Sequence, residues 1–198
     1  MAIRFVYQPR KAIAAVSYLA QADLPDLTKG KIDKLLFLAD KLHLVSTGRP
    51  ITGDWYAALP HGPVPSNTDN LLDAFEAGEY CIDCLQLVNE VRLDARFQYP
   101  HFVKNTDSPT TTQDLSVSDQ RVLDQILRQY GSKSFSELRS ITHEMPAYEK
   151  AWATRTGNRG DMNFADFFEE DSDAVAGVRE EVIENCALRS VFPEPVWE

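Results

Sequence analysis

The chain has 198 residues, with 20 Lys and Arg against 30 Asp and Glu, and a formal net charge of -10. This length is enough for one buried core without metal or disulfide staples. The charge repels a nucleic-acid backbone unless the basic residues gather on one face. No apolar run approaches the roughly 18 residues of a membrane span, and residues 1–10 lack the apolar region of a secretory signal, so we expect a cytoplasmic location.

Apolar side chains at helical spacing predict a first helix over residues 10–22 and a second over residues 31–45. Leu38 and Phe37 widen the apolar stripe of the second helix, which indicates a central position in the fold. The polar side chains that we expect on its solvent face are Asp33, Lys34, Asp40 and Lys41.

Residues 46–65 contain many glycines and prolines, which exclude a helix and leave room for one short extended piece over residues 55–59. Ser66 and Asp69 resemble a capping box. A third helix over residues 67–77 is therefore expected after a structured loop.

The second half of the chain begins with alternating apolar residues between positions 85 and 103, a pattern typical of strands. Residues 104–114 form the best linker candidate because they contain no aliphatic side chain. Capping residues and helical spacing then predict helices over residues 117–130, between Ser134 and Pro146, over 147–154 and over 173–189.

These elements predict a mainly α fold with minor β structure. We expect a compact helical domain of about six to seven helices with one short antiparallel strand pair. Its expected core consists of Ile13, Val16, Leu35, Leu36, Ala39, Leu42, Trp55, Leu71, Leu72, Phe75, Val122, Leu123, Ile126, Leu138 and Ile141.

The cysteines leave two interpretations open. Cys81 and Cys84 form one C-x-x-C pattern, which is half of a zinc site or a redox pair if it is functional. Cys186 and His101, which would have to complete a zinc site, lie at no recognised ligand spacing. We therefore expect two small buried hydrophobic side chains, no metal and no cofactor.

The chain has no nucleophile elbow, Walker loop, dinucleotide fingerprint or paired-histidine zinc helix. A binding protein is therefore expected rather than an enzyme. The alternative is a small hydrolase or transferase that uses His61 or His143, with Asp54 or Glu144 to orient the imidazole.

Several segments together resemble the Panacea domain, also called the SocA-like antitoxin domain. The resemblance begins in residues 32–40, 48–51 and 54–64 and continues to Thr142-His143-Glu144, in the order of the family. Two departures are His61, where the family has an aromatic residue, and the absence of a Trp directly after Thr142-His143. The positions that match the family motif are Lys34, Leu35, Leu36, Gly48, His61, Gly62, Pro63, Val64, Thr142, His143 and Glu144.

The resemblance implies an antitoxin-like protein of a bacterial or phage-borne toxin-antitoxin system. Such a protein binds a cognate toxin and silences it, or hands it to a Clp-type protease as an adaptor; the family occurs in bacteria and in mobile elements. An antitoxin domain over residues 1–155 is expected, with an acidic helical extension over residues 156–198 packed on it. An acidic DNA-associated regulator is a further alternative, but the chain shows no basic recognition helix, so we expect no nucleic-acid partner for it alone.

Two features predict the surface that binds a partner. Residues 161–184 hold nine acidic residues and one basic residue, Arg179, which is typical of a solvated helix face or of a surface that attracts a basic partner. The corner formed by residues 49–65 is stiff, so binding there costs little ordering entropy. The predicted partner-binding residues are Arg49, Trp55, Tyr56, His61, Glu169, Glu170, Asp171 and Asp173.

Overall fold

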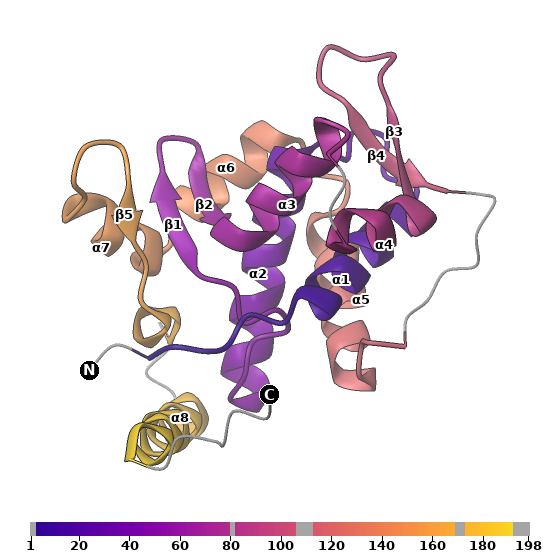
Figure 1. The fold of residues 1–198 in the computed structure, drawn as a ribbon. Helices are drawn as coiled ribbons and strands as arrows, with labels where there is room; N and C mark the ends of the chain where they lie inside the picture. The colour runs from indigo at the N-terminus through magenta and orange to yellow at the C-terminus, as the bar shows by residue number, and fades with distance from the viewer. Residues whose placement is uncertain (1–2, 80–81, 106–112, 169–172, 192–198) are drawn as a thin grey trace.

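The computed structural model describes residues 3–79, 82–105, 113–168 and 173–191 (Figure 1). The mainly α class with minor β structure is confirmed, with more helices than expected: the described residues contain eight α-helices and one short 3₁₀ helix. They are α1 (Pro9–Gln21), α2 (Lys29–Thr47), α3 (Ser66–Glu76), α4 (Ile82–Glu90), α5 (Val117–Tyr130), α6 (Phe135–His143), α7 (Pro146–Ala153), η1 (Phe164–Phe167) and α8 (Asp173–Val191).

Two small antiparallel sheets accompany these helices, where one strand pair was expected. The first has the order β2-β1-β5 and consists of β1 (Tyr56–Leu59), β2 (Gly62–Pro65) and β5 (Gly160–Asp161). The second pairs β3 (Val91–Asp94) with β4 (His101–Lys104). Figure 1 shows this β3-β4 hairpin projecting from the helical body.

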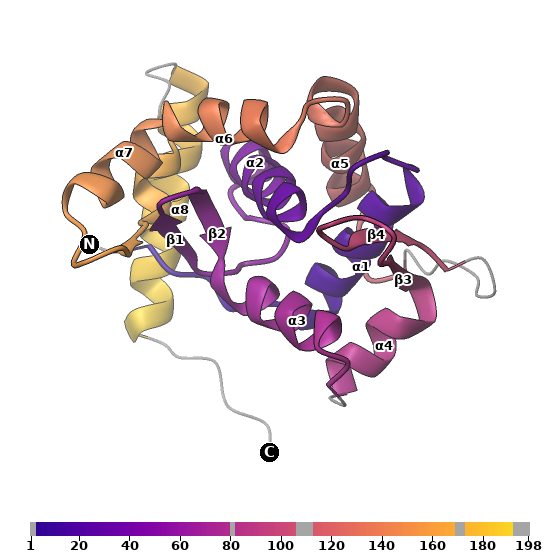
Figure 2. The same ribbon diagram turned by 90° about the horizontal axis from the view of Figure 1, so that it is seen from above.

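The helix α2 occupies the centre of the fold. Figure 2 shows it almost end-on, with α1, α3, α5, α6 and the β1-β2 hairpin arranged around it, and α8 also packs against it. The central position predicted from Phe37 and Leu38 is confirmed. The prediction that its polar residues face solvent is wrong for Asp33, Lys34 and Asp40, which are buried, while Lys41 is half-buried. A helix covered on all sides has no solvent face on which to place them.

Residues 84–90 are helical, which contradicts the strand interpretation of this part of the 85–103 segment. Cys84, Leu87 and Val91 are buried, and their spacing of three and four residues also fits a helix. The strand pair itself is present, but it begins only at Val91. Most of the predicted linker over residues 104–114 lies outside the described residues.

The breaker-rich segment forms two strands rather than one. Ala57 pairs with Val64, and Ser66 N–H donates to the Trp55 carbonyl (2.8 Å), so Pro63 and Pro65 fall at positions whose nitrogens point away from β1. Prolines are tolerated in β2 because this strand lies at the edge of the sheet.

The predicted core is confirmed except at three positions. Leu42 and Ile141 are half-buried, and Trp55 is 36% exposed. The neighbouring Tyr56 takes the interior place: its ring packs edge-on against Phe37 (5.4 Å between centroids) and lies close to Phe167 of η1. The segment after residue 155 therefore contributes to this core through η1 and through the pairing of β5 with β1. The domain division after residue 155 stays a prediction.

No helix in the described ranges is long and apolar enough to cross a membrane.

Candidate functional site

Two buried carboxylates hold the corner of residues 49–65 in place. Asp40 of α2 accepts hydrogen bonds from the backbone N–H groups of Ile51 (2.8 Å) and Thr52 (2.9 Å) and from the Tyr56 hydroxyl (3.0 Å). Burial raises the pKa of Asp40 to about 6, although these hydrogen bonds act in the opposite direction. The central helix thereby fixes the path of the loop in front of it.

The second carboxylate, Asp54, caps helix α3. It accepts hydrogen bonds from the N–H groups of Asn67 (3.0 Å) and Thr68 (2.8 Å) and from the Thr68 hydroxyl (2.6 Å). The predicted Ser66 capping box is wrong, because the helix begins at Ser66 and its N-cap residue is Pro65. Asp54, which lies outside the helix, accepts the backbone hydrogen bonds that the side chain of an N-cap residue would otherwise accept.

The side chain of Trp55 points outward from this rigid corner. The Arg4 guanidinium lies 4.5 Å from the centre of its ring. Trp55 and Arg4 line a cavity of about 440 Å³, together with apolar side chains from the N-terminal segment and from residues 161–164. We call Arg4, Trp55 and this cavity the Trp55 surface.

A second feature forms where the β1-β2 turn meets α6. Gly62 has a φ of +107°, and a Cβ atom at this position would lie 2.8 Å from Lys34 Cε, 3.1 Å from Thr142 Oγ1 and 3.5 Å from His143 Cδ2. The motif positions near both ends of the family resemblance therefore meet at one turn. Exposed His61 occupies the turn itself, and the Arg139 guanidinium donates to the Pro60 carbonyl (3.3 Å).

We call Lys34, His61, Gly62, Arg139 and His143 the basic corner. Burial lowers the pKa of His143, and the charges of Arg139, Lys34 and His61 lower it further. The His143 ring stacks on Tyr148 at 4.4 Å, and its Nε2 is buried with no hydrogen-bond partner among the described residues.

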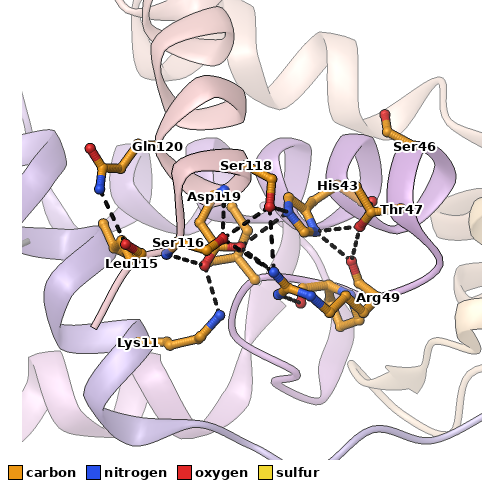
Figure 3. A network of polar contacts seen from close by, with 12 residues as sticks. Lys11, His43, Ser46, Thr47, Arg49, Leu115, Ser116, Ser118, Asp119 and Gln120 are labelled. Atoms are coloured by element: carbon orange, nitrogen blue, oxygen red, sulfur yellow. Dashed lines mark hydrogen bonds and ion pairs between the residues drawn. The ribbon is translucent and has the colours of Figure 1, made fainter. Parts of the chain in front are cut away.

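A third feature is a polar cluster around Asp119, which we call the Asp119 cluster (Figure 3). This buried carboxylate accepts from Lys11 Nζ (2.7 Å), from the Arg49 guanidinium (3.1 Å) and from the Ser116 backbone (2.9 Å), and His43 Nε2 lies 3.1 Å from it. Burial alone would raise the pKa of Asp119, but the hydrogen bonds from His43, Lys11 and Ser116 hold it well below its usual range. The capping of α5 by Ser116 with Asp119 is confirmed.

The Asp119 cluster contains Ser, His and Asp but lacks the geometry of a catalytic triad. Ser118 Oγ and Asp119 both face the same imidazole nitrogen, His43 Nε2, at 3.1 Å each. The other nitrogen, Nδ1, faces the Arg49 carbonyl at 2.6 Å. A triad needs the nucleophile and the acid on opposite nitrogens and an accessible histidine, whereas His43 is fully buried. The sequence analysis did not connect these residues, since they come from α1, α2, the following loop and α5.

The predicted partner-binding residues do not lie together. Trp55 and His61 are exposed, whereas Tyr56, which was also predicted to bind the partner, is buried. Arg49 is half-buried and bound to Asp119. Glu169, Glu170 and Asp171 lie outside the described residues, and Asp173 begins α8. The partner-binding role of the acidic residues stays a prediction.

The residues of the enzymatic alternative are not arranged for it. Both carboxylate oxygens of Asp54 accept hydrogen bonds from the first turn of α3, and Asp54 does not contact His61. Glu144 is exposed at the end of α6, and no hydrogen bond joins it to His143 within the described ranges. The predicted burial of Cys84 is confirmed, but Cys84 is disulfide-bonded and not a free thiol, and Cys81 lies outside the described residues. Within the ranges described, no group of three His, Cys, Asp or Glu side chains is placed to hold a metal ion.

Comparisons with known proteins identify the family of this chain from its sequence. A family model described as "Antitoxin SocA-like, Panacea domain" matches residues 32–152, well over half of the chain. Comparisons with curated proteins and with solved structures find no match. The matched range runs from α2 to α7 and includes every residue of the basic corner. The chain belongs to the SocA-like antitoxin, Panacea domain family.

Proposed function

We propose that this protein is an antitoxin that neutralises a partner toxin by direct binding, and that the Trp55 surface is the centre of the contact. The observation that carries the proposal is an exposed Trp on a rigid corner, above a cavity of about 440 Å³. Family membership supports the antitoxin role. The geometry of the Trp55 surface supports its assignment as the centre of the contact with the toxin.

Physical reasons favour this corner over other parts of the surface. Trp and Arg are the residue types that contribute most to binding at interface centres. The hydrogen bonds of Asp40 and Asp54 already order the loop, so a partner that binds there loses little conformational entropy. The cavity beside Trp55 gives room for an apolar side chain of the partner.

The test is co-expression of the chain with the toxin encoded by the neighbouring reading frame, followed by a binding measurement on the purified pair. Trp55→Ala should abolish rescue of growth and raise the dissociation constant at least about 30-fold, the range of an interface hot spot. Tyr99→Ala is the matched control, because Tyr99 is another exposed aromatic residue and lies on the distant β3-β4 hairpin. Equal binding by both variants would refute the role of Trp55.

Direct neutralisation and a Clp-type adaptor mode differ in the fate of the toxin. If binding alone silences the toxin, its level stays constant in rescued cells and rescue persists without the protease. In the adaptor mode the toxin disappears and rescue requires the protease. We propose the first mode, because a preordered aromatic contact is sufficient for stable binding.

The exposed acids of α8 support a basic partner. Glu180, Glu181 and Glu184 are exposed, in a segment whose sequence carries a large negative charge. Such charges raise the association rate with a basic protein more than the final affinity. Replacing these three residues by Gln should slow association at low salt and leave dissociation unchanged.

A further inference from the structure

The second sheet consists of the β3-β4 hairpin alone, so each of its two strands has an outer edge. The outer edge of β4 is covered at Phe102, whose N–H donates to the Leu27 carbonyl (2.8 Å). Phe102 lies opposite Leu93 in the register, and its N–H points away from β3, so the two residues form a non-hydrogen-bonded pair. The N–H and C=O groups of Leu93 therefore point away from β4, toward the outer edge of β3.

This outer edge of β3 is open. Among the described residues, no hydrogen bond joins the N–H or C=O group of Leu93 to another segment. Arg92 and Ala95, which flank the edge, are exposed, and the hairpin projects from the helical body (Figure 1). Proteins commonly protect such an edge with prolines or with charges that repel a second strand. Because β3 contains no proline, its charges decide which strand it accepts.

The charges of β3 are complementary to those of a second copy of the same strand. Arg92 and Asp94 lie on either side of Leu93 and, two residues apart, on the same face of the hairpin. In an antiparallel pair of two β3 strands with Leu93 opposite Leu93, Arg92 of each copy lies opposite Asp94 of the other. These are non-hydrogen-bonded positions, where opposite side chains come closest. Two pairs of unlike charges form, and no like charges lie directly opposite each other.

Both charged groups are available for this pairing. Arg92 is exposed and forms no hydrogen bond or ion pair within the described part of the chain. Asp94 already accepts from Arg96 of its own chain, with Nε 2.8 Å from one oxygen and 3.1 Å from the other. A carboxylate has about four acceptor positions. Asp94 can therefore accept from Arg92 of a second copy and retain its contact with Arg96.

We infer that the outer edge of β3 is a self-association site, and that it binds β3 of a second copy of this chain. The two Leu93 residues exchange their backbone hydrogen bonds across a two-fold axis, and each Arg92 pairs with Asp94 of the other copy. The β1-β2 hairpin lies away from β3 in both ribbon views, so each copy keeps its own Trp55 surface. Such an interface is small, and we expect a dissociation constant of about 10–100 μM. The inference does not depend on the proposed function.

Sedimentation of the full chain without toxin tests the association. From about 10 μM to about 1 mM, the average mass should rise from that of a monomer toward that of a dimer. Amide hydrogen exchange then locates the contact. The Leu93 N–H should exchange about fivefold more slowly, or slower still, at the high concentration, because only the dimer gives it an acceptor. The Arg92 N–H points to β4 and is the internal control, whose exchange should not change.

Charge reversal tests the pairing. Arg92→Asp places an acid opposite Asp94 and should raise the dissociation constant of the dimer at least about tenfold. Lys104→Asp is the matched control, since it makes the same change of charge on an exposed base of β4; it should alter the dissociation constant about twofold or less. An equimolar mixture of Arg92→Asp and Asp94→Arg should associate more tightly than either variant alone, because every opposite pair in the mixed dimer again joins unlike charges.

The inference is overturned if the chain stays monomeric up to about 1 mM, or if it associates without slower exchange at Leu93. Equal weakening by Arg92→Asp and Lys104→Asp, or a mixture that associates no better than its components, also overturns it. Slower exchange at Leu93 only when toxin is added would assign the edge to an extended segment of the toxin instead. The Trp55→Ala experiment measures toxin binding, so its result and the result at β3 are independent.

Discussion

The Asp119 cluster and the basic corner lie in one fold and differ in how completely their charges are matched. The Asp119 carboxylate contacts Lys11, Arg49, His43 and the Ser116 backbone (Figure 3). Each of these charged or polar groups therefore has a partner. In the basic corner, His143 Nε2 has no hydrogen-bond partner in the described chain, and burial lowers the pKa of Lys34 although the neighbouring Asp33 acts in the opposite direction. Groups that are fully paired join helices, whereas groups that lack partners have capacity left for a ligand.

The largest effect expected from this difference is on stability, at Asp119. Asp119→Ala removes the shared acceptor of three bases and the capping box of α5, and it should lower the free energy of unfolding by about 3–5 kcal/mol. Urea denaturation followed by circular dichroism measures this loss. Asp114→Ala is the control, because Asp114 pairs with the exposed Arg10 at 3.3 Å and should cost about 1 kcal/mol or less. Equal losses of stability in Asp119→Ala and Asp114→Ala would mean that the Asp119 cluster does not stabilise the packing of the segments it connects.

Asp33, which neighbours Lys34 of the basic corner, and Asp119 should make stability respond to pH in opposite directions. Asp33 has a raised pKa, so the folded state holds its proton between about pH 4 and pH 8 while the unfolded state does not, and its contribution to stability declines as pH rises through that window. Asp119 has a lowered pKa, so its contribution is complete above the unfolded pKa of about 4 and is lost as pH falls below it. Comparing the stability of the wild type with Asp33→Asn and with Asp119→Asn across pH 3–9 measures both. The same pH trend in both comparisons would contradict the assignment.

Gly62→Ala tests the packing of the basic corner. The substitution strains a positive φ and places a Cβ atom 2.8 Å from Lys34 Cε, and we expect a loss of about 1–3 kcal/mol. Gly157→Ala is the matched control, since Gly157 also has a positive φ (+62°) but nothing within 4 Å of the added atom. Thermal unfolding should show a smaller loss for Gly157→Ala, about 1 kcal/mol. Equal losses for Gly62→Ala and Gly157→Ala would mean that steric contact with Lys34 does not restrict residue 62.

The smallest expected change in stability is that of Lys34→Met. An apolar side chain of similar length replaces a buried amine whose pKa is lowered by burial, so the free energy of unfolding should stay within about 1 kcal/mol of the wild type or increase. Chemical denaturation measures it. A loss comparable to that of Asp119→Ala would show that Lys34 has a structural partner after all and would remove the contrast between the two regions.

Much of the fold was predictable because its helices carry local signals. The capping boxes at Ser116 and Ser134 and the apolar spacing in α1, α2 and α5 each act within a few residues of chain. Residues 84–90 were wrongly interpreted as a strand. Residues four positions apart on one helix face are also separated by an even number of positions, so helical spacing can imitate the alternation of a strand. The β2 strand was missed because prolines are acceptable only on an edge, and the edge position is a property of the sheet.

The candidate sites were less predictable, because they form between distant segments. Nothing near Asp40 in the sequence shows that its carboxylate will hold residues 51–56, and nothing near Lys34 shows that it will meet Gly62 and His143. The resemblance to the family did mark Lys34, Gly62, Thr142 and His143 as motif positions. It named the members of the corner without giving their arrangement, whereas the Asp119 cluster had only its helix cap as a local signal.

The prolines of β2 also restrict how any partner can attach. Pro63 and Pro65 place nitrogens without hydrogen atoms on the outer side of β2, and β2 is itself buried against α2, α3 and α6, so an incoming strand would find neither donors at alternate positions nor access to this edge. At the other end, Gly160 of β5 lies so close to the Ala151 carbonyl of α7 that no side chain would fit there. Neither copies of the chain nor an extended toxin segment can lengthen this sheet along the β2 edge by regular strand pairing. A partner must therefore bind through exposed side chains rather than through this edge, and single substitutions can alter such side chains while the backbone stays the same.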